Sequence, residues 1–364
     1  MAVTRSVVSD GAERLPRAVA AIADALGTVC TCTALHVRHR GETVCDIAFG
    51  ELFPGGAAAQ PDAIFDLASL TKIVVGAALL ALIDRREGAL DDPIVRAIPE
   101  FTGRDPRRST VTFRHLLTHT SGLPPSVNAR DEVGAEPIIA RICAMPLRSA
   151  PGERVVYSDC AFILVGQAVA RLAQMPLADA VGTLVVDPLG IADFGFRPLG
   201  ALIERTVCTE NDPWRGRLLR GEVHDETCWS MNGVAGHAGM FGTASAAAEI
   251  AEMFRQGGAC DLRRVLMRPT AAAAVKEHAR SGDERRGLAW ALKAGEGRPC
   301  GPLLSESSFG HTGYTGTSVF VDPERALTIA LFTNRVHMSR DPEPIGALRV
   351  AVHDAVIRDL GLAS

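Results

Sequence analysis

The chain has 364 residues, of which 47% are hydrophobic and 22% are charged, and its formal net charge at pH 7 is −4. This composition is that of a globular protein with room for one large domain or two lobes. Its basic residues are mixed with acidic ones and form no stripe, so neither a nucleic acid nor a membrane surface is expected as a partner.

The N-terminal residues 1–26 carry charges throughout and lack the apolar core of a signal peptide. Apolar residues recur there at three- and four-residue steps, which predicts an amphipathic helix. The longest apolar run, residues 73–83, is too short to span a bilayer. These features together predict a cytoplasmic protein.

The nine cysteines are scattered and include no C-x-x-C pair. This pattern favours free thiols in a reducing compartment and argues against a zinc site. The sequence predicts no metal and no organic cofactor.

A β-hairpin is predicted near each end of the chain. Residues 33–40 and 43–50 alternate apolar and polar, which predicts a hairpin with one buried face. Residues 316–321 and 326–332 form the second, and a helix follows over 343–360. We expect an α/β (α+β) fold with one antiparallel sheet built from both termini and flanked by helices, plus a mainly helical lobe.

The expected lobes divide one continuous catalytic domain. Residues 1–72 and 301–364 form the α/β lobe, and residues 73–300 form the mainly helical lobe. A cleft between two such lobes is the expected place for a site.

Lys72 is one of three lysines in a chain with 35 arginines, and it lies three residues after Ser69. Lysine can lose its proton when desolvated, whereas arginine cannot. At the start of the apolar run 73–83, this pair predicts a hydroxyl nucleophile activated by an amine. The alternative is that Ser69 is a plain helix N-cap.

Two further segments hold both tyrosines of the chain. In Tyr157-Ser158-Asp159, a phenol near a cationic lysine would lose its proton more readily and act as a general base. In the segment His311-Thr312-Gly313-Tyr314, the glycine would let a substrate approach the strand, and a backbone N–H would complete an oxyanion hole. The alternatives are a tyrosine packed at a turn and an ordinary glycine-rich strand entry.

The order Ser-x-x-Lys, Tyr-Ser-Asp, His-Thr-Gly resembles the serine hydrolases of the class C β-lactamase and penicillin-binding-protein superfamily. The segments 114–123 and 309–317 are also similar to that family, and 221–226 with 233–241 resemble its subgroup of β-lactamase-related hydrolases. The resemblance covers about residues 15–360 and implies the β-lactamase/transpeptidase-like fold.

The resemblance also implies roles for individual residues. Ser69 would be the nucleophile, while Lys72 and Tyr157 would share the proton transfers, with the base left open between them. The backbone N–H groups of Ser69 and Tyr314 would form the oxyanion hole. Asp159 would lie across the cleft floor near Lys72.

The opposite wall of the cleft would be formed by His311 and Thr312. Two residues depart from the family pattern: Asp159 stands where many members have Asn, and His311 replaces the lysine of Lys-Thr-Gly. A carboxylate beside Lys72 favours its charged form, which gives Tyr157 more weight as the base. Histidine, largely neutral near pH 7, offers a weaker and switchable charge, which favours esters over penicillins and peptides.

Other polar residues are candidates for the cleft. His237 either touches substrate or ties a glycine-rich loop together, and Asn334 with Arg335 would reach the cleft and supply a carboxylate-binding charge. His224 and Asp225 are expected to form a structural hydrogen-bonded pair. His115 and His119 are expected to support a turn.

The leading hypothesis is a serine hydrolase that acylates Ser69 with a small-molecule ester or amide, acting like an esterase. A genuine class C-type β-lactamase or D,D-carboxypeptidase, which takes a β-lactam or a peptide, is the alternative among enzymes. A catalytically silent penicillin-recognising binding protein is the alternative from another class. The sequence does not determine the natural substrate or the oligomeric state.

Overall fold

The computed structural model describes residues 8–295 and 300–363 and is built around a nine-stranded antiparallel sheet. In spatial order the strands are β1 (Val8–Asp10), β3 (Glu42–Gly50), β2 (Cys32–His39), β16 (Leu327–Thr333), β15 (Ser318–Asp322), β14 (Phe309–Thr312), β13 (Ala291–Leu292), β12 (Glu284–Arg286) and β11 (Ala279–Ser281). β16 pairs with β2 along its whole length. This pairing confirms the prediction of a sheet built from both ends of the chain.

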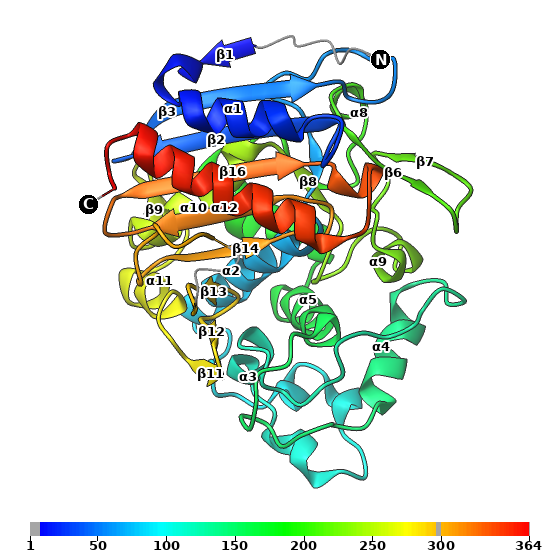
Figure 1. Ribbon diagram of the computed structural model, residues 1–364. Helices are drawn as coiled ribbons and strands as arrows, with labels where there is room; N and C mark the ends of the chain where they lie inside the picture. Colours follow the sequence, from blue (N-terminus) through cyan, green and yellow to red (C-terminus); the bar gives the residue numbers. More distant parts are fainter. Residues whose placement is uncertain (1–7, 296–299, 364) are drawn as a thin grey trace.

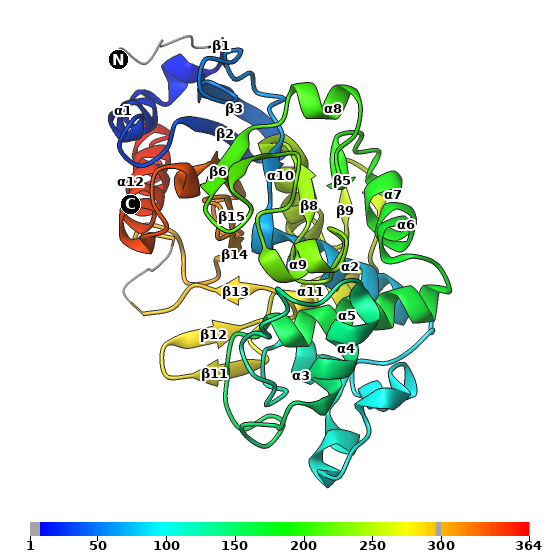
Figure 2. The ribbon, with the colours of Figure 1, turned by 90° about the vertical axis from the view of Figure 1, so that its right-hand side faces the viewer.

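Helices cover both faces of this sheet. Helices α1 (Pro16–Ala25) and α12 (Pro342–Asp359) pack together over one face (Figure 1). Helices α10 (Ala244–Arg255) and α2 (Thr71–Asp84) lie beyond the other face (Figure 2). Side chains of β16 alternate between two cores: Ile329 packs below α1 and α12, whereas Ala330 packs toward α2 and α10.

Strand β2 is buried on both faces, so the prediction of one buried face was wrong. The polar residues of this strand are covered because α10 packs against them. His36 and Arg38 are 4% and 6% exposed, and Arg38 pairs with Asp261 at 3.1 Å. Alternation of apolar and polar residues does not distinguish such a strand from one with a solvated face.

The middle of the chain is mainly helical. Its main helices, besides α2 and α10, are α3 (Phe113–Leu117), α4 (Ala135–Ala144), α5 (Asp159–Ala173), α6 (Leu177–Val181), α9 (Glu226–Ser230) and α11 (Arg268–Ala274). A small sheet of β4 (Phe65–Asp66), β8 (Met240–Gly242) and β5 (Phe194–Phe196) joins them to the start of α2.

The lobe boundary expected at residue 300 differs from the structure. Strands β11 to β13, which span residues 279–292, extend the large sheet through the pairing of β13 with β14. These strands are two or three residues long and lack apolar alternation, so their sequence gives no strand signal.

Helix α2 lies at the centre of the molecule, and each of its residues from Thr71 to Leu82 is buried. This agrees with the expectation of a helix that is apolar all round. Within the described ranges no single helix is long and apolar enough to cross a membrane; only α5 taken with Leu177–Leu189, bent by 80°, meets the length and composition of a span.

Candidate active site

Ser69 lies in a tight turn at the entrance to α2. A short 3₁₀ turn, Ala68–Leu70, leads into the helix, and Ala68 has a φ of +45°. The N-cap position of α2 is Leu70, so Ser69 does not have the capping role that the sequence left open. Its Oγ instead accepts a hydrogen bond from Lys72.

The Lys72 ammonium group is fully buried and has three oxygen acceptors. Its Nζ lies 2.8 Å from Ser69 Oγ, 2.8 Å from Asp159 Oδ1 and 2.9 Å from the backbone oxygen of His237. Burial alone lowers the pKa of a lysine, but the charges of Asp159 and Tyr157 outweigh it and raise the pKa of Lys72. Lys72 is therefore held in its charged form.

The segment Tyr157-Ser158-Asp159 leads into α5. The Ser158 hydroxyl caps this helix, and Asp159 is its first residue. The Tyr157 ring centre lies 5.0 Å from Lys72 Nζ and 4.5 Å from the ring of His119. Nδ1 of His119 accepts the Ser158 N–H at 3.0 Å, so His119 supports this segment from below.

His311 and Thr312 end β14 and lie across the cleft from Tyr157. His311 is 4% exposed, and its Nδ1 donates to the backbone oxygen of Thr312 at 2.9 Å. Burial, followed by the charge of Lys72, lowers the pKa of His311 to about 3. His311 is therefore neutral near pH 7, in line with the expectation, and it becomes charged only near pH 3.

Gly313 brings the turn after β14 close to the turn that holds Ser69. A Cβ at Gly313 would lie 2.1 Å from Thr317 Oγ1 and 2.6 Å from the Leu67 carbonyl oxygen, so only glycine fits. Within the described residues, the N–H of Tyr314 has no hydrogen-bond partner, as an oxyanion donor requires. The Tyr314 ring is 47% exposed and lies 4.7 Å from the guanidinium of Arg335.

Ser69, Tyr157 and the segment His311–Tyr314 line a cleft of about 380 Å³, called here the Ser69 cleft. Its lining residues are Ser69, Tyr157, Arg286, Ala291, His311, Thr312, Gly313, Tyr314, Phe320, Arg335, Pro342, Ile345 and Arg349. The structure thus brings together most of the residues that the motifs singled out.

Arg286 and Arg349 line the cleft but were not predicted. Arg286 lies 5.4 Å from the ring of Tyr157, in a strand too short to detect from the sequence. Arg349 is buried on α12 and donates to the backbone oxygens of Gly313 and Thr317. An arginine next to the apolar stripe of α12 is a signal that the sequence did contain.

His237 and Asn334 are not among the residues that line the cleft. The His237 side chain is 2% exposed and its Nε2 bonds to Asp225 Oδ1 at 2.9 Å, so its contribution is the backbone oxygen facing Lys72. The Asn334 side chain bonds to the Thr31 hydroxyl at 2.8 Å and to backbone groups of neighbouring strands. Both side chains tie loops to the core.

His224 and Asp225 do not bond to each other, in contrast to the expected pair. His224 Nε2 bonds to Glu210 at 2.7 Å instead. His115 forms a capping box with Thr112 at the start of α3, which fits the expected role in a turn.

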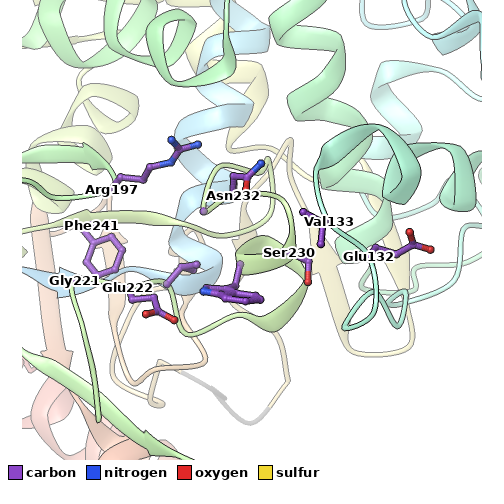
Figure 3. A pocket seen from close by; sticks show the side chains of 11 residues that line it. Glu132, Val133, Arg197, Gly221, Glu222, Ser230, Asn232 and Phe241 are labelled. Carbon is purple, nitrogen blue, oxygen red and sulfur yellow. The ribbon is translucent and has the colours of Figure 1, made fainter. Parts of the chain in front are cut away.

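A second hollow, of about 460 Å³, shares no lining residue with the Ser69 cleft. Arg197 and Phe241 reach it from one side and Glu132 and Val133 from the other (Figure 3).

Across residues 8–295 and 300–363, no group of three or more His, Cys, Asp or Glu side chains is placed to hold a metal ion.

A serine hydroxyl bonded to a buried lysine, with a tyrosine and a backbone donor across the cleft, defines an enzyme of the serine acyl-transfer class. The family model "Beta-lactamase" matches residues 19–353. The chain belongs to this family of serine hydrolases.

The relatives include enzymes named for different substrates. The chain is 32% identical over 347 residues to "Esterase EstB" of Burkholderia gladioli, covering 83% of this chain and 84% of that protein. It is 28% identical over 312 residues to a "Putative D-alanyl-D-alanine carboxypeptidase" of Salmonella agona, covering 77% and 71%. A solved family VIII carboxylesterase has a TM-score of 0.78 at 18% identity and covers 98% of this chain and 100% of its own, which supports the fold.

Proposed function

We propose that this enzyme hydrolyses small-molecule esters through an acyl-enzyme formed on Ser69. The observation that carries the proposal is the 2.8 Å hydrogen bond from Lys72 to Ser69 Oγ, at the floor of a cleft large enough for a small ester. The esterase name of the relative that is 32% identical supports the same substrate class.

In the proposed reaction, Ser69 Oγ attacks the ester carbonyl and its proton passes to Tyr157, which acts as the general base. Lys72 is not assigned as the base because Asp159 keeps it protonated. The N–H groups of Ser69 and Tyr314 receive the developing oxyanion. The leaving alcohol takes this proton from Tyr157. Water then attacks the acyl group and gives a proton to Tyr157, which passes it to Ser69 Oγ as the acid is released.

A neutral wall at His311 favours esters over anionic substrates. With a pKa of about 3, His311 carries no charge with which to hold a carboxylate at neutral pH. An uncharged ester needs no such partner, so the cleft is suited to it.

A D,D-carboxypeptidase or β-lactamase is the second candidate, and the three cleft arginines favour it. Arg286, Arg335 and Arg349 all line the cleft and would attract a substrate carboxylate. Arg335 and Arg349 already donate to backbone oxygens, which occupies N–H groups but leaves their charge in place. The carboxypeptidase name of the Salmonella relative points the same way.

A silent penicillin-recognising protein is the third candidate. It is disfavoured because Ser69, Lys72 and Tyr157 lie within reach of one another, as acyl transfer requires.

We also propose a reducing compartment such as the cytoplasm, since all nine cysteines are buried free thiols.

The test is a panel of short-chain p-nitrophenyl esters, nitrocefin and D-alanyl-D-alanine peptides, assayed on the wild type and on Ser69→Ala. The proposal predicts ester hydrolysis with the highest kcat/KM, abolished in the variant. Faster turnover of nitrocefin or of the peptide supports the second candidate. Acylation by penicillin without turnover of any substrate supports the third.

A further inference from the structure

Asp66 is a buried carboxylate, three residues before Ser69, that the proposed reaction does not use. It ends β4 and is 1% exposed, and among the described residues no lysine or arginine pairs with it. Burial raises the pKa of this carboxyl, while N–H groups of His224 and Ala68 act in the opposite direction. A carboxylate so placed costs free energy unless its oxygens are well used.

Three separate segments are bonded to Asp66. Its Oδ1 accepts the N–H of Ala68 at 2.8 Å, and its Oδ2 accepts the N–H of His224 at 2.6 Å. Its backbone oxygen accepts the hydroxyl of Thr315 at 2.7 Å. Asp66 therefore joins the nucleophile turn, the loop that carries His224, and the turn after β14.

The first of these bonds stabilises a strained turn. Ala68 is in the left-handed region, with a φ of +45°, which a non-glycine residue adopts at a cost. An Asp side chain that accepts the N–H two residues on favours such a turn. Ser69 follows directly, so this bond sets the direction of its Oγ and N–H.

The third bond acts on the other oxyanion donor. Thr315 is adjacent to Tyr314, whose N–H has no partner within the described residues. Thr317 forms a second hydrogen bond between the same two turns, since its hydroxyl donates to the carbonyl oxygen of Leu67 at 3.1 Å. A Cβ at Gly313 would meet this carbonyl oxygen at 2.6 Å, so the two turns have little slack.

We propose that Asp66 is a positioning residue that sets the distance and angle between the Ser69 and Tyr314 N–H groups by bonding both turns at once. The inference rests on the proposed function and deepens it. It predicts that loss of an Asp66 bond weakens binding of the transition state and leaves ground-state binding of the ester unchanged.

The test uses Asp66→Asn and Thr315→Val. In Asp66→Asn the side-chain amide still has one oxygen for the Ala68 N–H, but its NH₂ faces the His224 N–H as a second donor. Thr315→Val removes the bond to the backbone oxygen and leaves the carboxylate intact. Both variants are expected to lower kcat for p-nitrophenyl butyrate by about 10- to 100-fold with KM within about twofold of wild type.

A second readout is the inhibition constant of phenylboronic acid, whose tetrahedral adduct on Ser69 places an oxygen in the oxyanion hole. Its affinity should weaken in proportion to the fall in kcat/KM. Asp322→Asn is the matched control, because Asp322 is also fully buried and accepts the Ser305 N–H, at the far end of β15. That variant should lose stability but keep kcat.

The outcomes separate the two proposals. Wild-type kcat and boronate affinity in a folded Thr315→Val or Asp66→Asn protein overturn the positioning role while the proposed function stands. A rise in KM without a fall in kcat also overturns it. A wild type that neither hydrolyses the ester nor binds the boronate overturns the proposed function and this inference with it.

Discussion

Three buried histidines predict that this protein loses stability in mild acid. His119, His311 and His353 are each at most 4% exposed, and in each ring one nitrogen is hydrogen-bonded while Nε2 has no partner among the described residues. Burial, with neighbouring cations, lowers the pKa of His311 to about 3, that of His353 to about 4 and that of His119 well below its usual value.

The sign of the effect follows from linkage. The folded protein keeps these rings neutral, whereas the unfolded chain binds protons below a pKa of about 6.5. The contribution of the three neutral rings to the free energy of unfolding is therefore fully present above pH 6.5. It is lost as the pH falls toward the pKa values of the rings in the folded protein. When the pH falls from 7 to 5, each of these histidines lowers the free energy of unfolding by about 2 kcal/mol, and the three together lower it by about 6 kcal/mol.

That loss is comparable with the whole stability of a typical domain, about 5 to 15 kcal/mol. The assay is urea unfolding at pH 7, 6 and 5, followed by circular dichroism. The pH window lies above the pKa of ordinary carboxyl groups, which limits their contribution. We expect the midpoint to fall steeply between pH 7 and pH 5.

His353→Gln is the matched variant, because His353 bonds to the backbone of Cys300 under α12 and does not line the cleft. Glutamine keeps a donor for that carbonyl and does not titrate. The variant should lose about 2 kcal/mol less than wild type on going to pH 5. An unfolding free energy that is equal at pH 5 and pH 7 in the wild type would refute the reasoning.

Three further outcomes are expected. Lys72→Arg should lower kcat/KM for p-nitrophenyl esters by about 10³-fold or more, because the guanidinium cannot reproduce the contacts of the buried amine. The circular dichroism spectrum should not change. Near-normal turnover would contradict this expectation. Gly236→Ala should lower both Tm and kcat, because its Cβ would lie 1.9 Å from the Phe162 carbonyl oxygen. The clash would displace the loop whose His237 backbone oxygen accepts the Lys72 hydrogen bond. Gly195→Ala, whose Cβ meets nothing within 4 Å, is the control. Because the charge of Asp159 raises the pKa of Lys72, this lysine should keep its proton up to pH 10, and a fall in kcat/KM between pH 8 and pH 10 would count against the role given to its charged form.

Much of the fold could be predicted because its signals are local. Alternation of apolar and polar residues around short turns predicts the hairpins 33–50 and 316–332. An apolar run predicts the helix around 73–83, and an apolar stripe predicts the helix over 343–360. The motifs around Ser69, Tyr157 and His311 were recognisable because each is a few residues long. The structure brings all three to one cleft.

The remainder depends on contacts between distant segments. Strands β11 to β13 are defined by their neighbours in the sheet and have no pattern of their own, so Arg286 could not be placed in the cleft. The side chains of His237 and Asn334 turn away from the cleft because Asp225 and Thr31 supply partners elsewhere in the fold. Such pairings cannot be inferred from spacing.

The role of Ser69 is the central claim, and covalent labelling tests it most directly. The protein is treated with a fluorophosphonate, and the adduct is located by intact-mass and peptide mass spectrometry, with Ser69→Ala as control. The account predicts one adduct, on Ser69, formed in step with the loss of ester hydrolysis and absent from the variant. No adduct, or one on another residue of an active enzyme, would contradict it.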